Sequence, residues 1–130
     1  DRAVFEKELQ PLCVARNVGV INFYALAAGF LTGKYRSEAD VGKSLRGAKT
    51  TSLYLNPRGL RIVDALEQVA AQYKAQPSEV AIAWLLQQAG IAAPIASATS
   101  LAQLQSLVTA ATLQLDAAAL ATLDDASRED

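Results

Sequence analysis

VINFYALAAGFLTGKYR, residues 20–36, is the stretch that decides the fold of this 130-residue chain. Its first part, residues 20–26, is rich in β-branched and aromatic side chains and is short enough for a buried strand. Upstream, apolar residues recur at helical spacing over residues 2–16, and Pro11 either kinks this helix or confines it to one side. Asn17 and Gly19 tolerate the left-handed backbone that ends helices. A helix, a tight turn and an apolar strand are typical of an α/β protein with parallel strands.

A long polar segment separates the first predicted strand from further predicted helices and a second strand. Residues 28–56 are rich in glycine, lysine and arginine, and they predict a long cationic loop, which is usually functional or disordered. Asn56 followed by Pro57 predicts the start of a helix that runs to Tyr73. We expect further helices from Gln76 to Gly90, over residues 101–112 and over residues 116–127, with a short strand over residues 92–96.

The small number of predicted strands limits what the chain can form by itself. Two parallel strands cannot close a barrel or bury both of their faces. We therefore expect residues 1–130 to form part of one larger domain, and the lack of methionine favours an incomplete translation product. With 52% hydrophobic and 19% charged residues, the composition is that of a globular segment.

Charge and residue usage exclude several classes of function. Twelve basic and thirteen acidic residues give a net charge of -1, so no nucleic-acid partner is expected. Cys13 is the single cysteine and there is no histidine, so neither a disulfide nor an ordinary zinc site is expected. The first residues do not resemble a signal peptide, and no apolar run reaches the roughly 20 residues that a bilayer requires. We expect a cytoplasmic protein that does not bind membranes.

Two stretches have the composition of an anion site. One follows the first predicted strand and combines small residues and glycines with Lys34; the other, residues 97–100, places hydroxyls at the start of a helix. A solvated loop and a plain helix cap are the structural interpretations of the two stretches. In parallel α/β proteins, however, ligands bind beyond the carboxyl ends of strands, where both stretches are expected.

The sequence resembles the aldo-keto reductase family over essentially its whole length. Residues 20–36 are similar to the segment around the family's seventh barrel strand, and AIAWLL (residues 81–86) is similar to a late helix. APIASATSLAQL (residues 93–104) is similar to the eighth strand and the start of the phosphate-binding helix. The resemblance implies the C-terminal part of a (β/α)8 TIM barrel that binds NADP(H) and reduces aldehydes or ketones.

The resemblance also implies a set of cofactor-binding residues. Phe23 corresponds to the aromatic ring that stacks on the nicotinamide. Residues at the pyrophosphate would be Leu26, Ala27 and Gly29, with Lys34 reaching toward it. Residues at the adenosine 2′-phosphate would be Ser97, Thr99 and Ser100, followed by Gln103 on the same helix. The basic segment with Lys43, Arg46 and Lys49 would either fold over the cofactor or form a mobile surface loop.

Several positions depart from the family's pattern. Tyr24 and Ala25 stand where a serine and a proline are common, Ser100 where an arginine is frequent, and Leu107 where an asparagine often meets the adenine. The last two changes weaken the expected preference for NADP over NAD, because a hydroxyl cannot replace a guanidinium on a phosphate dianion.

No catalytic residue is assigned to this chain. The family's Asp, Tyr, Lys and His lie on earlier strands and loops, so the 130 residues alone are expected to be inactive. The alternative is a non-catalytic nucleotide-binding or regulatory fragment. Expected partners are a small carbonyl substrate and either the rest of the barrel or a second copy at the open strand edges. Trp84 is expected in the core, and Asp124 and Asp125 at a solvated helix end.

Overall fold

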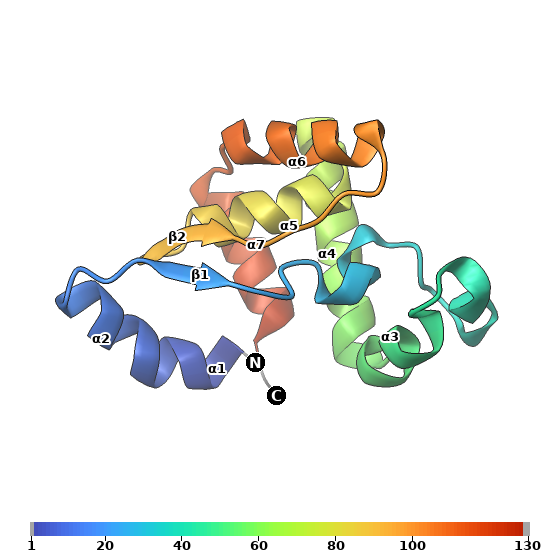
Figure 1. Cartoon of the computed structure of the whole chain (residues 1–130), viewed down its shortest axis with the longest axis horizontal. Helices are drawn as coiled ribbons and strands as arrows, with labels where there is room; N and C mark the ends of the chain where they lie inside the picture. The colour runs from blue at the N-terminus through green and yellow to red at the C-terminus, as the bar shows by residue number, and fades with distance from the viewer. Residues whose placement is uncertain (1, 129–130) are drawn as a thin grey trace.

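The computed structural model describes residues 2–128 and arranges them as a short parallel sheet covered by helices (Figure 1). The elements in chain order are α1 (Arg2–Val4), η1 (Phe5–Leu9), α2 (Gln10–Ala15), β1 (Val20–Asn22), η2 (Ala27–Thr32), η3 (Glu38–Lys43), α3 (Gly47–Tyr54), α4 (Pro57–Tyr73), α5 (Pro77–Leu86), β2 (Ile91–Pro94), α6 (Leu101–Thr112) and α7 (Ala117–Ser127).

The predicted amphipathic helix over residues 2–16 is present, and Pro11 affects its form. The middle of the helix, η1, is a π-helical turn directly before the proline. Because proline has no N–H to donate, the ordinary hydrogen-bond ladder is interrupted there, and a wider turn accommodates the break. Asn17 adopts a left-handed backbone (φ 53°) at the end of the helix, as predicted.

The two strands run parallel, with Val20 opposite Ile91 and Asn22 opposite Pro94. One irregularity lies between Val20 and Ile21. The ladder extends beyond the strands, since the Val20 N–H donates to the Gly90 carbonyl (2.8 Å) and the Ile95 N–H donates to the Asn22 carbonyl (2.7 Å). Within residues 2–128 the sheet therefore consists of one parallel pair.

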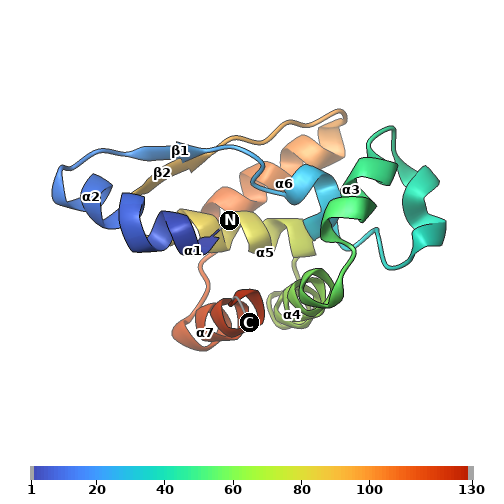
Figure 2. The same ribbon diagram turned by 90° about the horizontal axis from the view of Figure 1, so that it is seen from below.

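Three layers stack in the order sheet, α5, then α4 with α7 (Figure 2). The largest apolar cluster joins α4, α5 and α7 through side chains such as Leu66, Val80 and Leu123. A second cluster packs Ala25 against Ile82 of α5 and Ala110 of α6. A third cluster, formed by Phe30, Tyr35 and Val63, holds the segment after β1 against α4. The chain beyond β1 is thus fixed to α4, α5 and α6.

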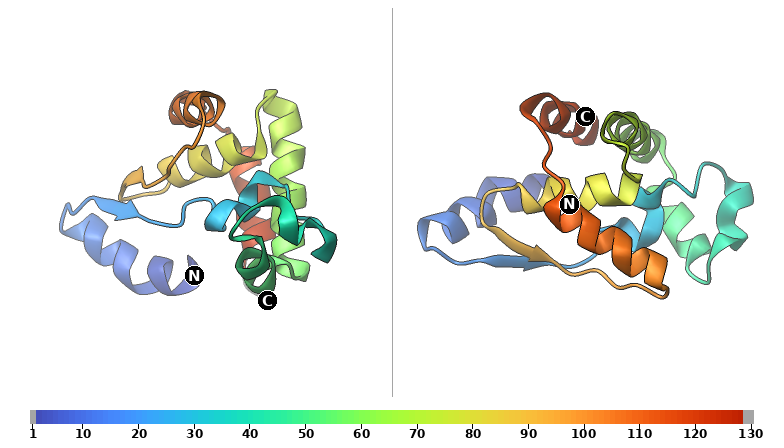
Figure 3. Two further views of the ribbon diagram at one scale, coloured as in Figure 1. Left: turned by 45° about the vertical axis from the view of Figure 1, so that its right-hand side comes forward. Right: turned by 90° about the horizontal axis from the view of Figure 1, so that it is seen from above.

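Helix positions agree well with the capping residues seen in the sequence. Asn56 accepts a hydrogen bond from the Gly59 N–H (2.8 Å) at the start of α4, and Asp116 accepts one from the Ala119 N–H (2.8 Å) at the start of α7. The view from above in Figure 3 shows α6 crossing beside α5, while α4 and α7 lie together on the far side.

Three sequence expectations need correction. The first strand ends at Asn22 and not at residue 26, because Tyr24 adopts a left-handed backbone (φ 58°) that turns the chain out of the sheet. Residues 28–56 contain η3, α3 and most of η2 instead of forming one irregular loop. Residues 77–86 form α5, which ends before Gly90.

No single helix in the described range is long and apolar enough to cross a membrane. Only α6 and α7 taken together have the required length and composition, and they are bent by 115° relative to each other.

Candidate cofactor site at the ends of the two strands

The turns after β1 and β2 leave the sheet at the same end, because the two strands are parallel (Figure 1). This arrangement is necessary for both turns to contact one ligand. Leu26, in the first turn, also packs against the apolar cluster that includes Ala110 of α6. The first turn is therefore tied to the helix that follows the second turn.

The turn after β1 has an unusual backbone. Ala27 (φ 48°) and Ala28 (φ 55°) both adopt the left-handed conformation, followed by Gly29 (φ 88°). The turn is closed by hydrogen bonds from the Ala27 N–H to the Tyr24 carbonyl and from the Gly29 N–H to the Leu26 carbonyl, both 2.8 Å. A left-handed backbone costs a non-glycine residue roughly 1–2 kcal/mol, and such strain clusters at binding and catalytic sites.

Lys34 lies directly over this turn. A Cβ atom added to Gly29 would lie 3.4 Å from the Lys34 Nζ atom, an ordinary contact distance, so the ammonium group lies beside the glycine. The Nζ atom also lies 5.1 Å from the centre of the Tyr35 ring, which is fully buried and stacks against Phe30. A small strained turn under a positioned cation fits an anionic group such as a pyrophosphate.

Two aromatic rings flank the turn. Phe23 is 71% exposed and Tyr24 is 57% exposed, and their rings meet edge to face with centroids 5.2 Å apart. An exposed phenylalanine at the end of a strand offers a flat apolar face for a planar ligand. The Leu26 side chain, in contrast, packs against two core clusters, so only its backbone is available to a ligand at this turn.

The turn after β2 is exposed throughout residues 97–100, and its hydrogen bonds cap α6. The Ser100 Oγ atom accepts from the Gln103 N–H (3.2 Å), and the Gln103 Oε1 atom accepts from the Thr99 N–H (2.8 Å) and the Thr99 hydroxyl (3.0 Å). The capping role considered from the sequence is therefore present. The N–H groups of Leu101 and Ala102, in the first turn of α6, have no acceptor within the helix, and they form the positive end of its dipole.

The basic segment after the first turn is folded, and its cations differ in their surroundings. Lys43 pairs with Asp40 (2.7 Å) and donates to the Lys34 carbonyl (2.8 Å), and this lysine, together with the Arg36 and Ser37 amides, holds the pKa of Asp40 well below its usual range. Arg46 and Lys49, in contrast, line a hollow of about 300 Å³ together with Tyr24 and Ala28.

The hollow could not be identified from the sequence, because its walls come from residues 24–28 and residues 46–54. Arg46 and Lys49 stood out only as part of a basic segment. Thr50 and Tyr54, which also line the hollow, carry no signal of binding in the sequence.

Comparison with known proteins matches residues 2–128 to the aldo/keto reductase family. The chain belongs to this family. It is 33% identical over 126 residues to an uncharacterized oxidoreductase of Mycobacterium tuberculosis, covering 94% of this chain and 38% of the relative. It is 30% identical over 119 residues to the NADH-specific methylglyoxal reductase of Escherichia coli, covering 88% and 35%.

A further relative is an aldo-keto reductase of Schizosaccharomyces pombe whose name specifies NADP(+), 30% identical over 88 residues, covering 64% of this chain and 25% of the relative. The matched part of the chain thus covers between 25% and 38% of the length of these curated relatives. The family resemblance inferred from residues 20–36, 81–86 and 93–104 is confirmed. The roles of the individual cofactor-binding residues stay predictions.

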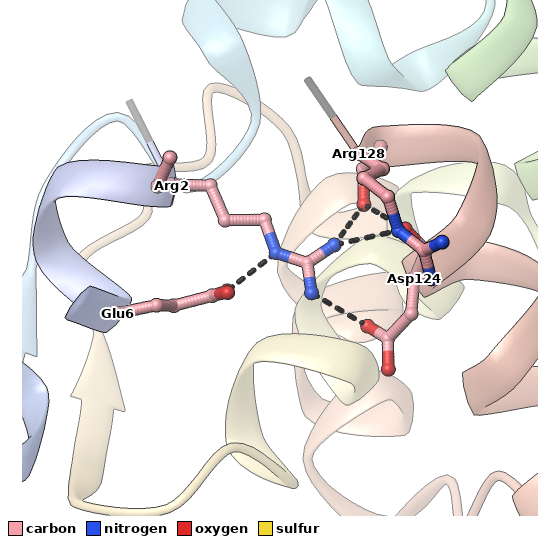
Figure 4. Close-up of a pocket in the computed structure, with 6 residues that line it drawn as sticks. Arg2, Glu6, Asp124 and Arg128 are labelled. Atoms are coloured by element: carbon pink, nitrogen blue, oxygen red, sulfur yellow. Dashed lines mark hydrogen bonds and ion pairs between the residues drawn. The ribbon is translucent and has the colours of Figure 1, made fainter. Parts of the chain in front are cut away.

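A second polar cluster of this aldo-keto reductase chain lies where α1 and η1 meet α7 (Figure 4). Arg2 pairs with Glu6 and with Asp124 (3.1 Å) and also donates to Ser127. The Trp84 Nε1–H donates to the same Asp124 carboxylate (3.0 Å), and the Arg2 guanidinium lies 5.0 Å from the Trp84 ring. Asp124 is therefore an anchor between helices, which corrects the expectation of a purely solvated helix end.

Proposed function

We propose that this chain is the C-terminal, cofactor-binding part of an NADP(H)-dependent oxidoreductase that reduces aldehydes or ketones to alcohols. The observation that carries the proposal is the parallel pairing of β1 and β2, because both candidate anion-binding turns then leave the sheet at the same end. The Lys34 ammonium lies beside Gly29 in the first of these turns. The proposal places β1 and β2 as the seventh and eighth strands of a (β/α)8 barrel. Other strands of the barrel would then pair with the open strand edges.

The residues of this chain would bind and orient the cofactor. The exposed ring of Phe23 would lie against the nicotinamide and present one of its faces to the substrate. Lys34 would neutralise part of the pyrophosphate charge beside Ala27 and Gly29. The start of α6, with Ser97, Thr99 and Ser100, would hold the adenosine phosphate, and Gln103 would keep the turn in shape. When bound, the cofactor supplies the hydride that the carbonyl carbon accepts.

The choice of NADP(H) over NAD(H) is part of the proposal. Among the relatives, the name of the Escherichia coli protein specifies NADH, and that of the Schizosaccharomyces pombe protein specifies NADP(+). The free amides at the start of α6 and the hydroxyls of residues 97–100 favour an additional phosphate, although no guanidinium stands at position 100.

Titration of the full-length protein with NADPH and with NADH, followed by the fluorescence of the reduced nicotinamide, tests this proposal. We expect binding of both cofactors with tighter binding of NADPH. Equal affinity for NADPH and NADH would show that residues 97–100 do not bind the 2′-phosphate. Lack of binding of either cofactor would refute the dinucleotide site. Binding without turnover of any aldehyde or ketone would instead favour a non-catalytic nucleotide-binding protein.

A further inference from the structure

The helix α6 is attached to its neighbours by apolar contacts and by one hydrogen bond. It lies beside α5 (Figure 3), and its buried Ala110 packs in one cluster with Ile82 of α5. The Ser106 hydroxyl of α6 donates to the Oε1 atom of Glu79 in α5 (2.8 Å). Within residues 2–128, this is the only side-chain hydrogen bond that joins α6 to another helix or strand.

The apolar contacts hold α6 from one side only. On the other side, Leu101, Leu104 and Val108 follow each other at helical spacing and are all exposed in the described part of the chain. Apolar burial is not directional, so it holds two helices together without fixing how far one has moved along the other. A hydrogen bond is directional and short. The Glu79–Ser106 hydrogen bond therefore sets the position of α6 along its own axis.

The surroundings of Glu79 leave its carboxylate few alternatives. The side chain is buried, and its Oε2 atom accepts from the Gln76 N–H (2.9 Å) at the start of α5. It forms no ion pair with any residue between 2 and 128. A buried carboxylate is costly unless its oxygens accept hydrogen bonds. Because one oxygen is used within α5, the other depends on the Ser106 hydroxyl.

The position of Ser106 determines where α6 begins. Ser106 follows the cap residue Ser100 by six positions, which is roughly 9 Å along an α-helix. Residues 101–112 form one uninterrupted helix, so a shift at Ser106 moves its first turn by the same amount. The turn after β1 is anchored separately, because Phe30 and Tyr35 pack against Val63 of α4. The spacing of the two candidate anion-binding turns thus depends on the Glu79–Ser106 hydrogen bond.

We propose that Glu79 is a positioning residue for the dinucleotide, acting through Ser106 on the first turn of α6. Glu79 does not touch the ligand; it sets the distance between the turn that would bind the pyrophosphate and the turn that would bind the 2′-phosphate. The inference rests on the proposed function. It assigns the pair a role in the preference for NADPH over NADH, because NADH lacks the phosphate that the start of α6 would bind.

The test is fluorescence titration of the full-length protein and its variants with NADPH and with NADH. Ser106→Ala should weaken NADPH binding about fivefold, the scale of the interaction of an anion with a helix N-terminus, and leave NADH binding within about twofold. Ser106→Thr keeps the hydroxyl and should keep the ratio of the two affinities. Glu79→Gln keeps a cap for α5 but offers Ser106 a weaker, neutral acceptor, so its ratio should lie between those of the wild type and Ser106→Ala.

Two control variants separate positioning from a general loss of stability. Ile82→Val loosens the packing of α5 against α6 and leaves the Glu79–Ser106 hydrogen bond in place. It should lower the melting temperature without changing the ratio of the two affinities. Thr109→Ala removes an exposed hydroxyl of α6 that bonds to no other helix within residues 2–128, and it should change neither quantity.

An unchanged affinity ratio in Ser106→Ala, with a wild type that prefers NADPH, would overturn the inference and leave the proposed function in place. An equal change of the ratio in Ile82→Val would overturn it too, because the ratio would then follow packing. A wild type that binds neither cofactor would refute the proposed function together with the inference. Hydrogen exchange of residues 101–105 in the free protein needs no cofactor: faster exchange in Ser106→Ala than in Ile82→Val supports the positioning of α6, and equal rates contradict it.

Discussion

Two groups of basic side chains in this molecule differ in what surrounds them. Where α1 meets α7, Arg2 has two carboxylates, a hydroxyl and an aromatic ring as partners (Figure 4). In the segment after β1, Lys34, the α3 cap residue Arg46 and the α3 residue Lys49 make no ion pair within residues 2–128. A cation whose partners are all internal contributes to the fold. A cation that has no carboxylate partner within the described chain is available to a ligand. This difference distinguishes the candidate cofactor site from the terminal cluster around Arg2.

The largest effect is expected from a change that removes no charge. In Gly47→Ala the new Cβ atom would lie 1.8 Å from the Val41 carbonyl oxygen, so η3 and α3 would have to separate. We expect a loss of about 2–3 kcal/mol in the free energy of unfolding, measured by urea denaturation. Gly42→Ala is the matched control, because nothing lies within 4 Å of its Cβ position. An unchanged stability of Gly47→Ala would contradict the tight contact between the two helices.

The contribution of the terminal cluster is tested with two neighbouring carboxylates. Asp124→Ala leaves both Arg2 and the Trp84 N–H without their shared acceptor, and we expect a loss of about 1–2 kcal/mol in unfolding free energy. Asp125→Ala removes only an exposed pair with Arg128 and should cost less than about 0.5 kcal/mol. Cofactor affinity should be unchanged in both variants. Similar stabilities of the two variants would show that the cluster is not structural.

Lys34→Gln tests a cation that has no carboxylate partner within residues 2–128. The free ammonium should contribute little to stability, whereas its loss should weaken NADPH binding about tenfold, equivalent to about 1.4 kcal/mol. Fluorescence titration and thermal unfolding of the same sample measure the two quantities. If stability fell while NADPH affinity stayed the same, Lys34 would belong with Arg2 among the structural cations.

The smallest effect concerns pH and the Asp116 cap of α7. The Ala119 N–H lowers the pKa of Asp116 below its ordinary value of about 3.9. The folded state therefore prefers the ionised carboxylate, so its contribution is complete above about pH 4 and is lost as the pH falls through the lower folded value. Asp116→Asn keeps a cap and should reduce the fall in melting temperature between about pH 4 and pH 2. An identical pH profile would exclude a role of this carboxylate.

The sequence predicted elements whose signals are local. Asn56, Ser100 and Asp116 were readable as helix caps because a capping side chain acts within four residues of its own position. The boundary of β1 and the fold of residues 28–56 were not readable, since the left-handed turns at Tyr24, Ala27 and Ala28 are rare for such residues.

The candidate site was predictable in part for the same reason. Family motifs pointed to the two turns, and parallel pairing of β1 and β2 places both at one end of the sheet. The hollow needed the tertiary structure, because Tyr24 and Arg46 come together only through the packing of α3 beside the first turn. The same holds for Arg2 and Asp124, which are separated by 122 positions.

The placement of Trp84 has a practical consequence for optical work on this protein. It is the one tryptophan of the chain. Its side chain extends from α5, donates to Asp124 of α7 and lies beneath the Arg2 guanidinium. Its emission will therefore report whether the first helix stays attached to the last one.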